Sequence, residues 1–108
     1  MIRTHRVASF GGAARAEYDY DDASGKVIRV RGTNDGPGTL RVRLFGTDTS
    51  GEARGWSREF SFAPGSGTTE HRVRGKRFDL EPDGRGPAGE GEPDYYPTLR
   101  GLATEASY

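Results

Sequence analysis

The chain has 108 residues, which is enough for one small domain. Its 16 basic and 16 acidic side chains balance, and the absence of cysteine excludes disulfides, thiolate nucleophiles and the usual zinc sites. No apolar run approaches the roughly 20 residues of a transmembrane helix, so we expect no membrane partner. Leu, Ile, Val and Phe supply only 17 residues, which predicts a thin core that contacts between subunits would support.

The first 16 residues resemble a secretory signal peptide, because Arg3 and Arg6 precede an apolar stretch. That stretch is short and contains Gly11 and Gly12. We therefore expect no cleaved signal peptide, a strand near residues 4–10, and a protein made in the cytoplasm.

Apolar and arginine residues alternate between residues 26 and 62, with turn residues between the runs. Successive side chains of a strand point to opposite sides, so each run has an apolar face and an arginine face. The apolar faces contain Ile28, Val30, Leu40, Val42 and Leu44, and the opposite faces contain Arg29, Arg31, Arg41 and Arg43. This pattern predicts antiparallel sheets that are buried on one side.

A first hairpin is predicted at residues 22–25, which match a type I turn followed by a left-handed glycine. Residue 22 then lies opposite residue 26. The expected cross-strand pairs are Tyr20–Ile28, Tyr18–Val30, Asp19–Arg29 and Glu17–Arg31. A single register thus pairs apolar residues on one face and opposite charges on the other.

A second hairpin is predicted at residues 48–51, where the same turn pattern recurs. The expected pairs are Leu44–Trp56, Leu40–Phe60 and Arg41–Glu59, with Trp56 in the core. Arg58 falls on the apolar side, so it requires a bulge, an edge position or a path to solvent for its charge.

The segment between the hairpins, residues 32–38, is rich in glycine and contains Pro37. Direct pairing across it would set Arg29 beside Arg41, and like charges disfavour that arrangement. We therefore expect an arch that carries the chain to a second sheet. With further strands at residues 68–74 and 77–80, the chain is predicted to be an all-β, antiparallel β-sandwich of the immunoglobulin-like or jelly-roll type.

Residues 81–97 break the pattern with four prolines and four glycines, which predicts a long irregular excursion. The expected organisation is a sandwich domain over residues 1–80 and an arm over residues 81–108. Residues 98–104 supply either a last strand or a docking segment. Residues 79–108 carry seven acids against two bases, whereas residues 23–78 carry eleven bases against five acids, so an acidic arm is expected to meet a basic neighbour.

No convergent set of acid, base and nucleophile is apparent. His5 and His71 fall on separate expected strands, and Ser66 lacks the spacing of a nucleophile elbow. The GxGxxG string at residues 84–89 follows no strand and contains Pro87. We expect neither an enzyme nor a cofactor.

Asp19, Asp21 and Asp22 could gather oxygens around calcium, but their spacing departs from an EF-hand loop. A turn with cross-strand ion pairs accounts for them better, so no metal is expected. Clustered arginines could also bind a polyanion. The zero net charge and the lack of interleaved aromatic residues instead favour a surface that faces solvent or a protein, so we expect no nucleic-acid partner.

Tyr95 and Tyr96 have two interpretations, since exposed rings either stack on a sugar or anchor the arm in a pocket of another subunit. The second interpretation is favoured because a flexible loop is a poor preorganised platform. The complete set of expected partner-binding residues is Arg29, Arg31, Arg41, Arg43, Tyr95, Tyr96, Leu99 and Tyr108.

One resemblance to known proteins rests on the rhythm of strands and turns over about residues 14–80. It is carried by Gly32, Thr33, Asn34, Asp35 and Gly36, then Leu40, Val42 and Leu44, then Phe60, Phe62, Ala63, Pro64 and Gly65. The pattern resembles small immunoglobulin-like sandwiches that serve as accessory modules in bacterial surface proteins, carbohydrate-active enzymes and the virions of tailed phages. The phage case implies a protein that decorates a capsid or builds a tail or fibre.

We therefore expect a non-enzymatic structural subunit of a virion or similar assembled particle. Its partners would be other protein subunits, either in a homo-oligomer or in a larger shell or tube. The alternative is a carbohydrate-binding sandwich module, with a glycan as the partner.

Overall fold

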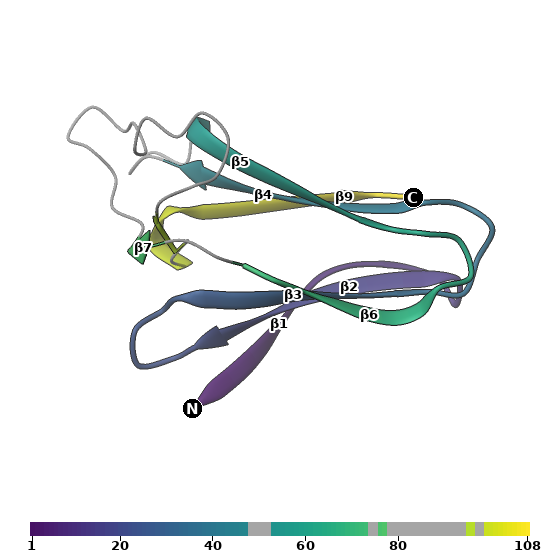
Figure 1. Cartoon of the computed structure of the whole chain (residues 1–108), viewed down its shortest axis with the longest axis horizontal. Helices are drawn as coiled ribbons and strands as arrows, with labels where there is room; N and C mark the ends of the chain where they lie inside the picture. The colour runs from purple at the N-terminus through teal and green to yellow at the C-terminus, as the bar shows by residue number, and fades with distance from the viewer. Residues whose placement is uncertain (48–52, 74–75, 78–94, 97–98) are drawn as a thin grey trace.

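The structure is a computed structural model that describes residues 1–47, 53–73, 76–77, 95–96 and 99–108. Two antiparallel sheets pack face to face (Figure 1). No α-helix occurs in these ranges. This arrangement confirms the predicted all-β sandwich.

The first sheet has four strands in the order β1-β2-β3-β6. Their bounds are β1 Ile2–Phe10, β2 Ala14–Asp21, β3 Val27–Asn34 and β6 Gly67–Arg72. The strands expected at residues 4–10 and 68–74 are thus confirmed as β1 and β6. β3 and β6 pair although the hairpin of β4 and β5 lies between them in sequence.

The second sheet has three strands in the order β5-β4-β9. Their bounds are β4 Leu40–Thr47, β5 Ala53–Phe62 and β9 Leu102–Ser107. β9 pairs antiparallel with β4, so the last strand belongs to the sandwich of its own chain. The sandwich therefore extends past the expected boundary at residue 80.

The first hairpin has the predicted register along most of its length. Tyr18 lies opposite Val30, and the two acid–arginine pairs also form. Near the turn, a bulge after Asp19 places Val27 opposite Tyr20, so the predicted Tyr20–Ile28 pair is wrong. The Asp21 amide donates to the Lys26 carbonyl, so residue 21 and not residue 22 lies opposite residue 26. The loop therefore has one more residue than expected, and the bulge accommodates it.

The second hairpin differs from its predicted register by two residues. Leu40 lies opposite Phe62, Leu44 opposite Arg58, and Arg43 opposite Glu59. The predicted pairs Leu44–Trp56, Leu40–Phe60 and Arg41–Glu59 are therefore wrong. An irregularity between Phe45 and Thr47 causes the shift. An even shift keeps every side chain on its predicted face, so the alternation alone could not reveal it.

Arg58 lies on an edge strand, as its position among apolar residues requires. β5 is the outer strand of the second sheet, and Arg58 is half-buried. Its guanidinium carbon lies 5.6 Å from the centre of the Phe60 ring, so the charge faces an aromatic ring of the same strand.

The arch between the two sheets is held by Asn34, which is fully buried. Its Nδ2 donates to the carbonyls of Gly38 and Phe62, both at 2.9 Å. Its Oδ1 accepts from the Gly36 amide at 3.1 Å. Both donors of this amide group and its oxygen thus serve the passage from β3 to β4.

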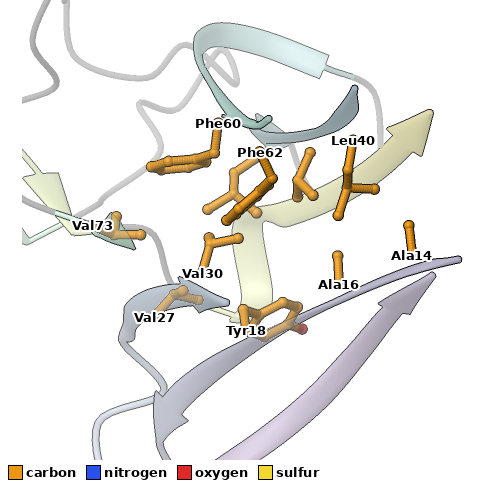
Figure 2. Packing of buried hydrophobic residues seen from close by; sticks show 11 residues of the cluster. Ala14, Ala16, Tyr18, Val27, Val30, Leu40, Phe60, Phe62 and Val73 are labelled. Carbon is orange, nitrogen blue, oxygen red and sulfur yellow. The ribbon is translucent and has the colours of Figure 1, made fainter. Parts of the chain in front are cut away.

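The core lies between the sheets, as Figure 2 shows. Its members from the first sheet are Ala14, Ala16, Tyr18, Val27 and Val30, and those from the second are Leu40, Val42, Leu44, Phe60 and Phe62, with Val73 beside them. The Phe62 ring packs directly over Gly32, where an added Cβ would lie 2.6 Å from a ring carbon. Ile28 is only half-buried, because the bulge in the first hairpin gives its core position to Val27.

A short parallel pairing joins β7, Lys76–Arg77, to β8, Tyr95–Tyr96. The 3₁₀ turn η1, Leu99–Gly101, then leads into β9. The predicted second turn at residues 48–51, most of the strand at residues 77–80 and most of the excursion at residues 81–97 lie outside the described residues.

Candidate protein interaction surface

The outer face of the first sheet carries a row of alternating charges that crosses all four strands. Arg6 of β1 lies opposite Glu17, Glu17 opposite Arg31, and Arg31 opposite Glu70 of β6. We call Arg6, Glu17, Arg31 and Glu70 the charge row. The Arg31 Nη1 donates to Glu17 at 2.7 Å and its Nε to Glu70 at 3.2 Å. Hydrogen bonding to Glu17, followed by that to Glu70, raises the pKa of Arg31.

Asp19 lies beside the charge row and is only 2% exposed. One of its oxygens accepts from the hydroxyl of Thr4 at 2.6 Å. The other oxygen is bonded by Arg31 and lies 3.1 Å from Arg29 Nε. Arg29 and Arg31 thus cover a buried carboxylate of their own chain, and this network closes the middle of the face.

The outer face of the second sheet is more open. Arg43 lies opposite both Glu59 and Glu105, and its Nη1 donates to Glu105 at 3.1 Å. The Nε of Arg41 lies 3.6 Å from Glu59. All these side chains are about half exposed, since their exposed fractions run from 48% to 59%. They line a depression of about 350 Å³, together with Ala106 and Ser107.

The four arginines that the sequence assigned to partner binding therefore lie on two different faces. Arg29 and Arg31 belong to the first sheet, and Arg41 and Arg43 to the second. All four have carboxylate neighbours within their own chain.

The predicted aromatic and apolar partner residues are also separated. Tyr95 and Tyr96 form β8, and their side chains fall outside the described set. Leu99 is 39% exposed, and its amide donates to the carbonyl of Gly25 at 3.0 Å. Tyr108 packs at the other end of the sandwich against Phe10, with ring centres 5.6 Å apart.

Tyr108 also helps to close the arch between the sheets. Its hydroxyl accepts from the Gly38 amide at 3.3 Å. An added Cβ at Gly36 would fall on this hydroxyl, so the ring fills the space that the glycine leaves. Tyr108 is 40% exposed, but its ring and hydroxyl already make contacts within its own chain.

The N-terminal half of β1 is an exposed part of the first sheet. Residues 1–6 are all exposed, including Met1 at 80% and Ile2 at 49%. The strand runs away from the second sheet at this end (Figure 1). Among the described strands, only β2 pairs with β1, so one edge of β1 is open. The alternation of residues 1–6 carries little apolar signal, so the pattern alone could not reveal this exposure.

Met1 ties the start of β1 to the turn between β2 and β3. Its ammonium group lies 3.2 Å from Asp22, which also accepts a hydrogen bond from Arg3 at 2.7 Å. The hydrogen bond from Arg3 lowers the pKa of Asp22, and the one to Asp22 raises the pKa of the Met1 ammonium group. The pKa of Asp21 is lowered by a hydrogen bond from Ser24 and one from the Ala23 amide.

The remaining candidate groups lie apart from one another. His5 of the outer strand β1 stacks on Tyr18 of β2. His71 of the other outer strand, β6, packs against Phe60 and Phe62 of the second sheet. Among the residues with described positions, no three or more His, Cys, Asp or Glu side chains group in a way that would hold a metal ion. The same part of the chain has no helix with the length and apolar character to span a membrane.

Comparison with known proteins gives no relative, since no family model, curated protein or solved structure matches the chain.

Proposed function

We propose that this protein is a non-enzymatic structural subunit that assembles with copies of itself. The assembly would be of the kind formed by accessory proteins of phage virions, such as decoration, minor capsid, tail or fibre proteins. The sandwich serves as the scaffold, and exposed strand edges make the contacts.

The exposure of β1 carries this proposal. Residues 1–6 are all exposed, yet β1 pairs regularly with β2 through Arg6. An ordered strand with exposed residues and one unpaired edge offers backbone groups and side chains to a neighbour. The thin core supports the same conclusion, because two of its members are alanines, Ala14 and Ala16.

The use of the arginines within the chain also supports a protein partner. Arg29 and Arg31 are engaged by Asp19, Glu17 and Glu70. A polyanion would have to displace these carboxylates before it could bind. Contacts at the strand edges leave the network intact.

Sedimentation velocity over a wide range of protein concentration tests the proposal. We expect species heavier than the 11.7 kDa monomer, with a fraction that rises with concentration. A monomer at every concentration would contradict the proposal.

The depression on the second sheet favours one other function, a carbohydrate-binding module. Arg41 and Arg43 offer donors, and Glu59 and Glu105 offer acceptors, around about 350 Å³ of open space. Phe45 adds an aromatic ring on the same face, 5.3 Å from the Arg43 guanidinium carbon. Mixed donors and acceptors beside a ring suit the hydroxyl groups of a sugar. A glycan array with the native chain and an Arg41→Ala variant tests it, and signals equal for both proteins would count against this face.

A further inference from the structure

We infer that β1 of one copy pairs antiparallel with β6 of the next copy, so that four-stranded sheets join edge to edge in a head-to-tail series. This inference rests on the proposed function and names the surfaces that form the contact. The occupant of each edge is a second copy of the same chain.

The strand order makes this pairing geometrically continuous. β1 and β6 are the two outer strands of the first sheet, and every neighbouring pair within it is antiparallel. β1 and β3 therefore run in one direction, and β2 and β6 in the other. A β1 strand placed beside β6 continues the alternation of directions, as antiparallel pairing requires.

The charge row determines the partner of each edge. It begins with the positive Arg6 on β1 and ends with the negative Glu70 on β6. Both end residues are exposed, Glu70 with half of its side chain. When copies join from β6 to β1, Glu70 meets Arg6 of the next copy, and the signs alternate without interruption from one subunit to the next.

The same register is free of charge conflicts at the neighbouring positions. In an antiparallel pair with Glu70 opposite Arg6, His71 lies opposite His5, and Arg72 lies opposite Thr4. No two Arg, Lys, Asp or Glu side chains of like charge meet at these positions. The bulge between Arg6 and Ala8 limits regular pairing to the N-terminal half of β1, which is the exposed half.

Pairing of like edges is less favourable. Two β1 strands would bring together edges that each carry Arg3 and Arg6, and two β6 strands centred on Glu70 would oppose two carboxylates. Like charges directly opposite one another destabilise strand pairs. Because the two edges differ, the contact is heterologous, and it produces either a ring or an open filament.

Charge reversal at the two ends of the row tests this contact. Sedimentation velocity would be measured for Arg6→Glu, for Glu70→Arg, and for an equimolar mixture of the two variants. Each variant alone places like charges at the contact, so we expect its association to weaken on the order of tenfold. In the mixture, Glu at position 6 of one protein meets Arg at position 70 of the other, and association should recover.

Arg15→Glu is the matched control. Arg15 is exposed on the same sheet face, but it lies on the inner strand β2, away from both edges. Its reversal should leave association unchanged. If the native chain assembles and the edge variants assemble equally well, the edge contact is overturned while the proposed function stands. A native chain that remains monomeric contradicts both.

A second measurement covers the case in which Glu70→Arg disturbs folding through its neighbour Arg31. Hydrogen exchange of the native chain would be compared between dilute and assembled samples. We expect new protection in residues 4–6 and 70–72, with none in the outer strands β5 and β9. Protection confined to the second sheet would overturn the inference.

Discussion

Asn34 connects the two sheets through the carbonyl of Phe62, to which its Nδ2 donates at 2.9 Å across 28 positions of sequence. The ring of Phe62 packs in turn over Gly32, two residues before Asn34. The start of the arch and the end of β5 are therefore fixed to each other by a polar contact and an apolar one.

Replacing Asn34 with alanine should strongly destabilise the fold. The change leaves the carbonyls of Gly38 and Phe62 and the amide of Gly36 without their buried partner. We expect a loss of about 2–4 kcal/mol in the free energy of unfolding, measured by urea denaturation. Asn34→Asp keeps the acceptor but removes both donors, so it should also destabilise. Native stability in both variants would show that water replaces these contacts.

Replacing Gly32 with alanine should introduce a steric conflict with Phe62. The added Cβ would lie 2.6 Å from the ring, which has no space to retreat because Phe62 is only 1% exposed. We expect a loss of about 1–3 kcal/mol by urea denaturation. Gly12→Ala is the control, since a Cβ there meets nothing within 4 Å, and its effect should stay within about 0.5 kcal/mol. Equal effects would contradict the proposed packing.

Removing the carboxylate of Asp19 should cost far more than removing that of Glu105. Asp19 is buried beneath two arginines, whereas Glu105 pairs with Arg43 at a side-chain exposure of 59%. Asp19→Ala is expected to lose about 3 kcal/mol, and Glu105→Ala less than about 1 kcal/mol. Thermal unfolding at low and high salt would separate them further, because salt screens the exposed pair more strongly than the buried one. A large loss for Glu105→Ala, or none for Asp19→Ala, would contradict this distinction.

The ion pair between Met1 and Asp22 predicts a stability that depends on pH at both ends of its range. The pKa of Asp22 is lowered in the folded chain, so its contribution is present above the unfolded value and is lost as pH falls through the folded value. The pKa of the Met1 ammonium group is raised, so its contribution is lost as pH rises through its folded value.

Comparison of Asp22→Asn with the native chain measures this effect. At neutral pH the variant should have the lower melting temperature. The difference should shrink as the pH falls through the lowered pKa of Asp22, since below it both forms carry an uncharged side chain at this position. A difference that persists unchanged in acid would mean that the loss comes from hydrogen bonding or packing instead of charge.

The strands and their faces could be predicted from the sequence because alternation fixes which side each residue faces. Val30, Leu40, Val42 and Leu44 are all fully buried as expected. The register of each hairpin depends in addition on where bulges form. A bulge near the first turn and an irregularity after Phe45 changed the pairing while leaving most residues on their predicted faces.

The residues of the candidate interaction surface were harder to predict from the sequence. Acid–arginine pairing in the first hairpin could be derived from its turn, but the role of Glu70 required the pairing of β3 with β6, which no local pattern shows. The use of Asn34 as a connector was likewise missed. Its signal was an amide residue directly before the turn sequence of residues 35–38.

β4 pairs on one side with its sequence neighbour β5 and on the other with β9. Contacts of the second kind join distant parts of the chain, since Arg43 and Glu105 are 62 positions apart. Closing so long a loop is slow compared with forming a hairpin. During folding, the β4–β5 hairpin would therefore form first and present an unpaired β4 edge until β9 arrives. The extent of aggregation during folding should then depend on how fast β9 pairs with β4, a strand far from it in sequence.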